Sequence, residues 1–229
     1  MNQLKSGLRR VLCFLVLLFE FSNLQAQVLV HEEPRHRPVF QNRQVRILNV
    51  LLPPGDTTQY HIHHTPSVFI FFTSTTTGSQ LQGATASTST SVAGSIIFEN
   101  LAAPHLRVHR VWNMDKDTFH VMDLELLSKD SGFVQRPLTL PGLQLAIDTA
   151  WVRAYRLTLS AENDFILRDK KRSLILVTLD TVLVQTKHNG ETRDQTLEPG
   201  SFFEIKGRHS FSLKNRGGDA AHFALLEMP

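Results

Sequence analysis

The sequence predicts an all-β protein made of two tandem modules, and three observations lead to this interpretation. From Val45 onward, short runs rich in Val, Ile, Phe, Leu and Thr are separated by turns containing Gly, Pro, Asn or Asp, which is typical of antiparallel sandwiches and barrels. Helical periodicity is weak throughout. Residues 113–125 also align without a gap with residues 215–227, where Asn, Asp, His, Leu and Glu recur in register. We therefore expect two copies of one β module of about 100 residues.

The boundary between the modules is predicted at residues 128–143. This stretch interrupts the β pattern and contains Pro137 and Pro141, so we interpret it as a linker between an N-terminal module at 27–127 and a C-terminal module at 144–229.

Each module is expected to be a succession of short strands. The small, hydroxylated stretch Gly83–Ser91 is predicted to be an exposed hairpin loop. The clearest strands are predicted at Val45–Leu52, Ser67–Thr73, His109–Trp112, Phe119–Leu127, Trp151–Leu159, Ser173–Thr186 with a break, Phe211–Lys214 and His222–Met228.

The first 26 residues have the anatomy of a signal peptide. Lys5, Arg9 and Arg10 precede an apolar run at Val11–Phe19, and small and polar residues lead to an expected cleavage site after Ala26. The apolar run is shorter than the roughly 20 residues that a spanning helix needs. We therefore expect a periplasmic or secreted protein with no stable membrane insertion after cleavage.

The composition of the remaining chain excludes several classes of function. The single cysteine, Cys13, lies inside the expected signal peptide, which rules out disulfide frameworks, thiolate metal sites and thiol nucleophiles in the mature chain. Three of the 24 basic and one of the 21 acidic residues also lie there, so the mature chain is nearly neutral. Its charge therefore gives no indication of nucleic-acid binding.

Three histidines of the first module could carry chemistry. Side chains alternate between the faces of a strand, so His61 and His63 in His61-Ile-His63 share one face. His109, on a later strand, could supply a third nitrogen. Three neutral imidazoles with an open position are typical of a catalytic metal site, whereas histidines that only hydrogen-bond to the backbone would be the plainer interpretation.

The spacing of these histidines resembles the two metal-binding motifs of the cupin superfamily of small β-barrels. The first motif is Gly55, five residues, then His61-x-His63, and the second is Pro104, four residues, His109, three residues, Asn113. Together with the repeat, the chain resembles a secreted bicupin, that is, two tandem cupin-type jelly-roll barrels. The resemblance covers Val39–Glu125 well and Leu145–Met228 weakly.

The sequence departs from the cupin pattern at several places. Ser67 and Val68 stand where the first motif has a glutamate, and Phe98 and Leu106 stand where the second has glycines. No His-x-His occurs after Leu145. The resemblance therefore permits a three-histidine site in the first barrel and implies a degenerate second barrel without metal.

The resemblance implies a protein that binds one divalent metal ion through His61, His63 and His109 and acts on a small organic molecule, as a dioxygenase or an isomerase does. Fe, Zn, Mn and Ni all suit imidazole ligands. The alternative is a non-enzymatic protein that binds a small ligand, such as a carbohydrate or an organic acid, without metal. The sequence leaves both alternatives open, and leaves open whether two chains form a homodimer.

Two further residues are candidate substrate-binding groups. Arg46 lies on a predicted strand and could bind a carboxylate through its guanidinium group. His120 recurs as His222 in the second module and could line the mouth of the barrel.

Overall fold

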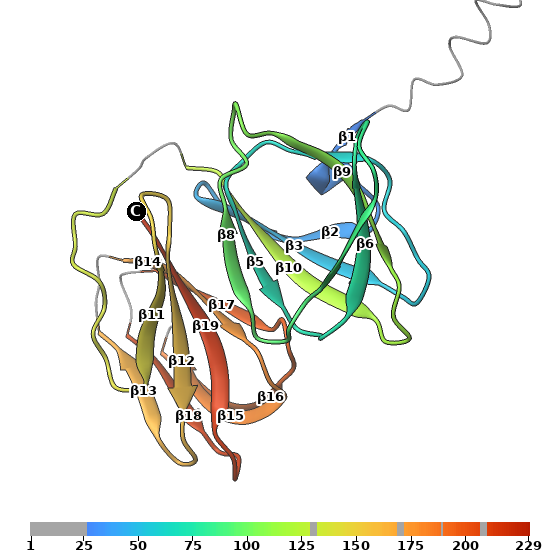
Figure 1. Ribbon diagram of the computed structural model, residues 1–229. Coiled ribbons are helices and arrows are strands. Elements are labelled where there is room, and N and C mark those ends of the chain that lie inside the picture. Colours follow the sequence, from blue (N-terminus) through green and yellow to red (C-terminus); the bar gives the residue numbers. More distant parts are fainter. Residues whose placement is uncertain (1–26, 129–131, 169–171, 189, 207–209) are drawn as a thin grey trace, which may run out of the picture.

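The computed structural model describes residues 27–128, 132–168, 172–188, 190–206 and 210–229. Figure 1 shows two β units side by side, joined by an extended segment. The one short helix is a 3-10 turn, η2 (Val30–Glu32), and the other elements of the described residues are strands, so the all-β prediction is confirmed. The expected signal peptide at 1–26 lies outside the described residues.

The first unit consists of two five-stranded sheets, which we call the site sheet and the packing sheet. The site sheet has the strand order β1 (Val28–Leu29), β4 (His61–His63), β9 (Arg107–Asn113), β6 (Thr76–Leu81) and β7 (Ser87–Thr90). The packing sheet has the order β2 (His36–Gln41), β3 (Val45–Leu52), β10 (Phe119–Leu126), β5 (Ser67–Phe71) and β8 (Ile96–Glu99).

The second unit repeats this topology. One sheet has the order β11 (Leu143–Asp148), β12 (Arg153–Leu159), β19 (Ala221–Met228), β14 (Ser173–Thr178) and β17 (Phe202–Lys206). The other has the order β13 (Asp164–Leu167), β18 (Phe211–Asn215), β15 (Val182–His188) and β16 (Glu191–Leu197). The strand order therefore matches that of the first unit once β1 is set aside.

Two asparagines show that the repeat extends to atomic detail. The Asn113 amide donates to the carbonyls of Leu52 and Asp117, at 2.9 and 2.7 Å. The Asn215 amide donates to the carbonyls of Leu159 and Asp219 at the same two distances. Each buried asparagine thus ties a turn to the end of a neighbouring strand.

The interiors of the two units differ. The second unit is filled by a large apolar cluster that includes Tyr155, Leu157, Phe211, Phe223 and Leu225. In the first unit the buried members of the interior cluster are Val50, Leu52, Phe119 and Val121. The first unit therefore has an interior with room for a cavity.

A third apolar cluster joins the units. Alternation along β3 and β10 directs Ile47 and Leu124 away from the first interior, and they pack in one cluster with Ala154, Ile175 and Leu226 of the second unit. The Arg156 guanidinium also donates to the carbonyl of Gly94 at 2.6 Å. The central strand β10 of the packing sheet is therefore buried along almost its whole length, on both faces.

Candidate metal centre

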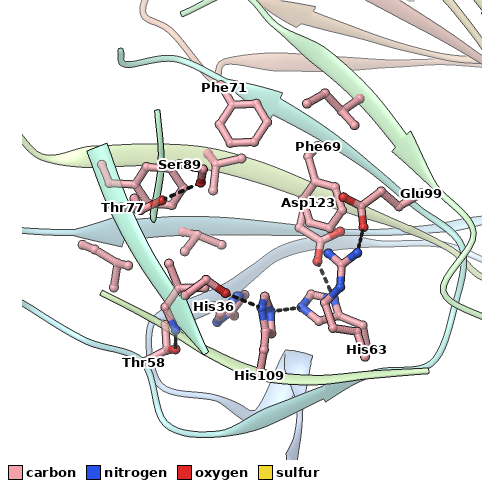
Figure 2. A pocket seen from close by; sticks show the side chains of 18 of the residues that line it. His36, Thr58, His63, Phe69, Phe71, Thr77, Ser89, Glu99, His109 and Asp123 are labelled. Atoms are coloured by element: carbon pink, nitrogen blue, oxygen red, sulfur yellow. Dashed lines mark hydrogen bonds and ion pairs between the residues drawn. The ribbon is translucent and has the colours of Figure 1, made fainter. Parts of the chain in front are cut away.

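The structure brings together His61, His63 and His109. His61 and His63 lie on the same face of β4 and are buried, while His109, on the adjacent β9, is directly opposite His61 in the strand register. The Nε2 atom of His63 is 3.2 Å from that of His61 and 3.1 Å from that of His109. Figure 2 shows His63 and His109 pointing toward each other.

A fourth histidine, His36, joins this cluster from the packing sheet. Its ring centroid is 4.5 Å from that of His61, and one ligand atom each from His36, His61 and His63 lie within 4.8 Å of one another. His36 was not among the predicted ligands, because it lies on a different strand, far from His61 in sequence and outside either motif. The only signal was its place in the histidine-rich first module.

Most of the imidazoles are oriented through their Nδ1 atoms. The Nδ1 of His61 is 2.9 Å from the carbonyl of Gln59, and that of His36 is 2.7 Å from the Glu33 carboxylate. Both partners are acceptors, so Nδ1 carries the hydrogen and Nε2 has a free lone pair. Glu33 also accepts from the backbone N–H of Gln59 at 3.1 Å, and therefore helps to orient both rings.

The surroundings keep His61, His63 and His109 neutral. Burial, reinforced by His36, lowers the pKa of His61 to about 4, and burial, reinforced by His61, lowers the pKa of His109 to about 2. Burial together with the adjacent His109 and His61 lowers the pKa of His63 well below its usual value. Neutral imidazole is the form that binds metal ions.

A buried carboxyl group, that of Asp123, lies beside the cluster. Asp123, on β10, is buried, and neither of its oxygens is hydrogen-bonded within the described part of the chain. Its Oδ2 lies 3.5 Å from His63 Nδ1. Burial, reinforced by the charge of Glu125, raises the pKa of Asp123 well above its usual range.

The cluster opens on a cavity of about 370 Å³ inside the first unit. His36, His63, His109 and Asp123 contribute to its polar side (Figure 2). Its apolar wall is formed by Val50, Leu52, Phe69, Phe71, Leu81, Ile97, Val111, Phe119 and Val121. The cavity therefore combines a polar, histidine-lined side with a largely apolar wall.

The other two predicted site residues lie elsewhere. Arg46 forms an ion pair with the buried Glu125 at 2.8 Å and also donates to Gln41. The Nε2 of His120 is 2.7 Å from Asn49 Oδ1, and its ring packs against Phe72. Neither residue is among those that line the cavity.

The equivalent positions of the second unit lack these histidines. In the register that pairs β4 with β9, His61 faces His109, and in the corresponding pair β13 and β18, Leu167 faces Phe211. Both belong to the apolar core of the second unit. The second interior is filled at the place where the first carries its cluster.

Comparisons with known proteins identify the fold. No family model matches the sequence, and no curated protein sequence matches it. Solved structures do match: salicylate 1,2-dioxygenase from Pseudoaminobacter salicylatoxidans, solved with gentisate adducts, superposes with a TM-score of 0.62 at 13% identity, covering 94% of this chain and 79% of that chain.

Two further structures cover similar shares of the chain. AerE from Microcystis aeruginosa has a TM-score of 0.56 at 11% identity, covering 86% of this chain and 98% of that chain. A cupin 2 conserved barrel domain protein from Leptotrichia buccalis has a TM-score of 0.53 at 6% identity, covering 84% and 88%.

The protein therefore has the fold of the cupin superfamily, with two tandem jelly-roll units, as the motifs predicted. Its first unit contains a group of histidines that could hold a metal ion. Within the described residues, no helix is long and apolar enough to cross a membrane.

Proposed function

We propose that this protein is a metal-binding cupin whose first barrel holds one divalent ion through His61, His63 and His109, beside a cavity that takes a small organic molecule. The observation that carries the proposal is the convergence of three Nε2 atoms, two pairs of which are 3.1 and 3.2 Å apart.

The close approach of the nitrogens favours a cation between them. His61 presents a lone pair at Nε2, because its Nδ1 hydrogen goes to Gln59. Bringing neutral acceptor nitrogens together away from water is unfavourable unless a proton or a cation lies between them. Metal–nitrogen bonds of about 2.0–2.1 Å place neighbouring ligand atoms about 3.0–3.4 Å apart, so the observed spacing fits.

His36 is proposed as a further ligand. It belongs to the group of convergent histidines, and the Glu33 carboxylate fixes its Nδ1, as carboxylates commonly do for metal-bound imidazoles. His36 thereby offers a fourth ligand in a chain where Ser67 and Val68 replace the glutamate of the cupin motif.

The chemistry proposed is that of a dioxygenase or an isomerase. A divalent ion held by imidazoles supplies a Lewis acid, and iron additionally supplies redox chemistry. The structural similarity to salicylate 1,2-dioxygenase supports the first type. Fe, Zn, Mn and Ni all suit this ligand set.

We also propose, from the N-terminal sequence, that the protein acts in the periplasm or outside the cell.

The second candidate function is binding of a small ligand without metal. Replacement of the motif glutamate by Ser67 and Val68 favours it, and the cavity would serve either function.

Elemental analysis of untagged protein separates the two candidates. We expect close to one divalent ion per chain, and its loss in a variant with alanine at 61, 63 and 109. The matched control replaces three exposed histidines, His64, His105 and His222, and should keep the metal. A volume-conserving His109→Gln variant, whose fold is checked by circular dichroism, separates loss of a metal ligand from loss of the fold. A wild-type protein that stays metal-free after reconstitution would favour the second candidate.

A further inference from the structure

Arg107 occupies a distinctive place at the mouth of the cavity. It precedes His109 by two residues on β9, so their side chains share one face, and it is directly opposite His63 in the strand register. Arg107, Glu99 and Leu81 line both the inner cavity and an outer hollow of about 440 Å³. These three residues therefore lie where the cavity meets the outside.

Arg107 forms an ion pair with Glu99. Its Nη2 contacts Oε2 of Glu99, which Figure 2 shows beside His63 and Asp123. Both side chains remain about one-third exposed, at 33% and 30%. Because both side chains remain partly exposed to water, an anion that enters the cavity can compete with Glu99 for the guanidinium group.

Arg107 is also the one lysine or arginine among the described residues that line the cavity. A guanidinium group is planar and binds a carboxylate through two parallel hydrogen bonds. The remaining wall is dominated by apolar side chains, including Phe69, Phe71 and Phe119. This pairing of one cation with an apolar wall fits a ligand with one anionic group and an apolar body.

The Glu99 carboxylate narrows the choice of anion. It lines the cavity beside Arg107, and like charges repel strongly where water is scarce. A dianionic phosphate ester would meet this repulsion with a single arginine to offset it. A carboxylate monoanion meets less repulsion and matches the geometry of one guanidinium group.

We propose that Arg107 anchors the carboxylate of an apolar monocarboxylic acid, which replaces Glu99 as the partner of the guanidinium group at the cavity mouth. The proposal deepens the proposed function, because it names the substrate class of the same site. Glu99 then acts as an internal competitor that occupies Arg107 while the cavity is empty of ligand.

Calorimetric titration with hexanoate and with its neutral analogue hexanamide tests this proposal. Wild-type protein should bind hexanoate more tightly than hexanamide. Arg107→Gln should weaken hexanoate binding about tenfold or more and leave hexanamide binding unchanged, while Arg107→Lys should lose part of the affinity because it lacks the bidentate fork. Glu99→Gln should act in the opposite direction and strengthen hexanoate binding about three- to fivefold.

Two variants control for charge alone. Arg110 lies on the same strand but contacts Gln80, Tyr60 and Trp112 rather than the cavity, and Glu32 is exposed on η2. Arg110→Gln and Glu32→Gln should bind hexanoate as the wild type does. Wild-type protein that fails to bind hexanoate, an Arg107→Gln variant with unchanged affinity, or equal effects of the control variants would overturn the proposal.

Metal content measured on the same samples distinguishes failure of the carboxylate anchor from failure of the proposed metal site. Because Arg107 and Glu99 are not among the proposed ligands, their variants should retain the metal of the wild type. Wild-type protein without metal whose hexanoate binding still depends on Arg107 would contradict the proposed metal site and support the carboxylate anchor.

Discussion

At the scale of single residues, the buried imidazoles should make the stability of the metal-free protein depend on pH. The pKa of His61 falls from 6.5 to about 4 on burial, reinforced by His36. Between these values the unfolded chain binds a proton that the folded chain does not, so stability falls as the pH drops through this window. The full shift corresponds to about 3 kcal/mol. Urea unfolding of chelator-treated protein at pH 7 and pH 5 measures the effect.

A comparison with His61→Leu isolates this contribution. Leucine stands at the matching register position of the second unit, Leu167, so it suits a buried place on such a strand. The variant should lose less stability between pH 7 and pH 5 than the wild type, whereas the exposed His64→Gln should behave as the wild type. Identical pH dependence in wild type and His61→Leu would show that His61 is not held neutral by burial.

Asp123 is predicted to reduce the stability of the fold. Both of its oxygens are buried without a hydrogen bond in the described part of the chain, and the repeat places Leu225 at the equivalent position of the filled second unit. Removing a buried polar group that makes no hydrogen bond typically recovers about 1–3 kcal/mol. Asp123→Leu should therefore raise the free energy of unfolding in urea. A destabilised variant would show that the carboxyl group has a partner that stabilises the fold.

At the scale of elements, the repeated asparagine turns should contribute equally in the two units. Asn113→Ala and Asn215→Ala each remove two hydrogen bonds to backbone carbonyls, at a cost of about 1–3 kcal/mol. Asn100→Ala, on the surface, should cost less. Urea unfolding of the three variants checks this, and a large effect in only one of the two repeat positions would contradict the equivalence of the turns.

The strands that sequence reasoning located are those with strong apolar patterning. The range predicted at Val45–Leu52 is that of β3, and Phe119–Leu127 differs from β10 by one residue. In contrast, part of the expected loop Gly83–Ser91 forms β7, whose four residues are all exposed Ser and Thr. An exposed strand without apolar side chains shows no apolar alternation in its sequence. It is held in the sheet by backbone pairing with β6.

The candidate site was predictable where it depends on one strand pair. Alternation along β4 placed His61 and His63 on one face, and the second motif added His109 from the neighbouring β9. His36 was not predictable, because it reaches the cluster from the opposite sheet. The same reason explains Asp123 on β10, whereas Arg107 shares one face of β9 with His109 and so follows from the same alternation.

At the scale of the whole molecule, the interface between the units should couple their stabilities. Leu226 of the second unit packs in one cluster with Ile47 and Leu124 of the first. Leu226→Ala should cost about 2–5 kcal/mol and accelerate hydrogen exchange in the packing strands of both units, β10 as well as β19. The exposed Leu145→Ala serves as the control. Faster exchange confined to the second unit would mean that the two units are stabilised independently.

The two units differ in how their interiors contribute to stability. The second interior is packed with large side chains, whereas the first contains a cavity, neutral histidines and the buried carboxyl group of Asp123. Such features cost stability. Contact with a fully packed partner unit across the shared apolar cluster offsets part of that cost for the first.

X-ray absorption spectroscopy at the edge of the metal that co-purifies with untagged protein tests the central claim most directly. We predict an ion surrounded by nitrogen and oxygen at about 2.0–2.2 Å, with the multiple scattering of four imidazole rings. The imidazole signal should decrease by one ring in His36→Gln. A metal without imidazole ligands, or a spectrum unchanged by substitutions at 61, 63 and 109, would contradict it.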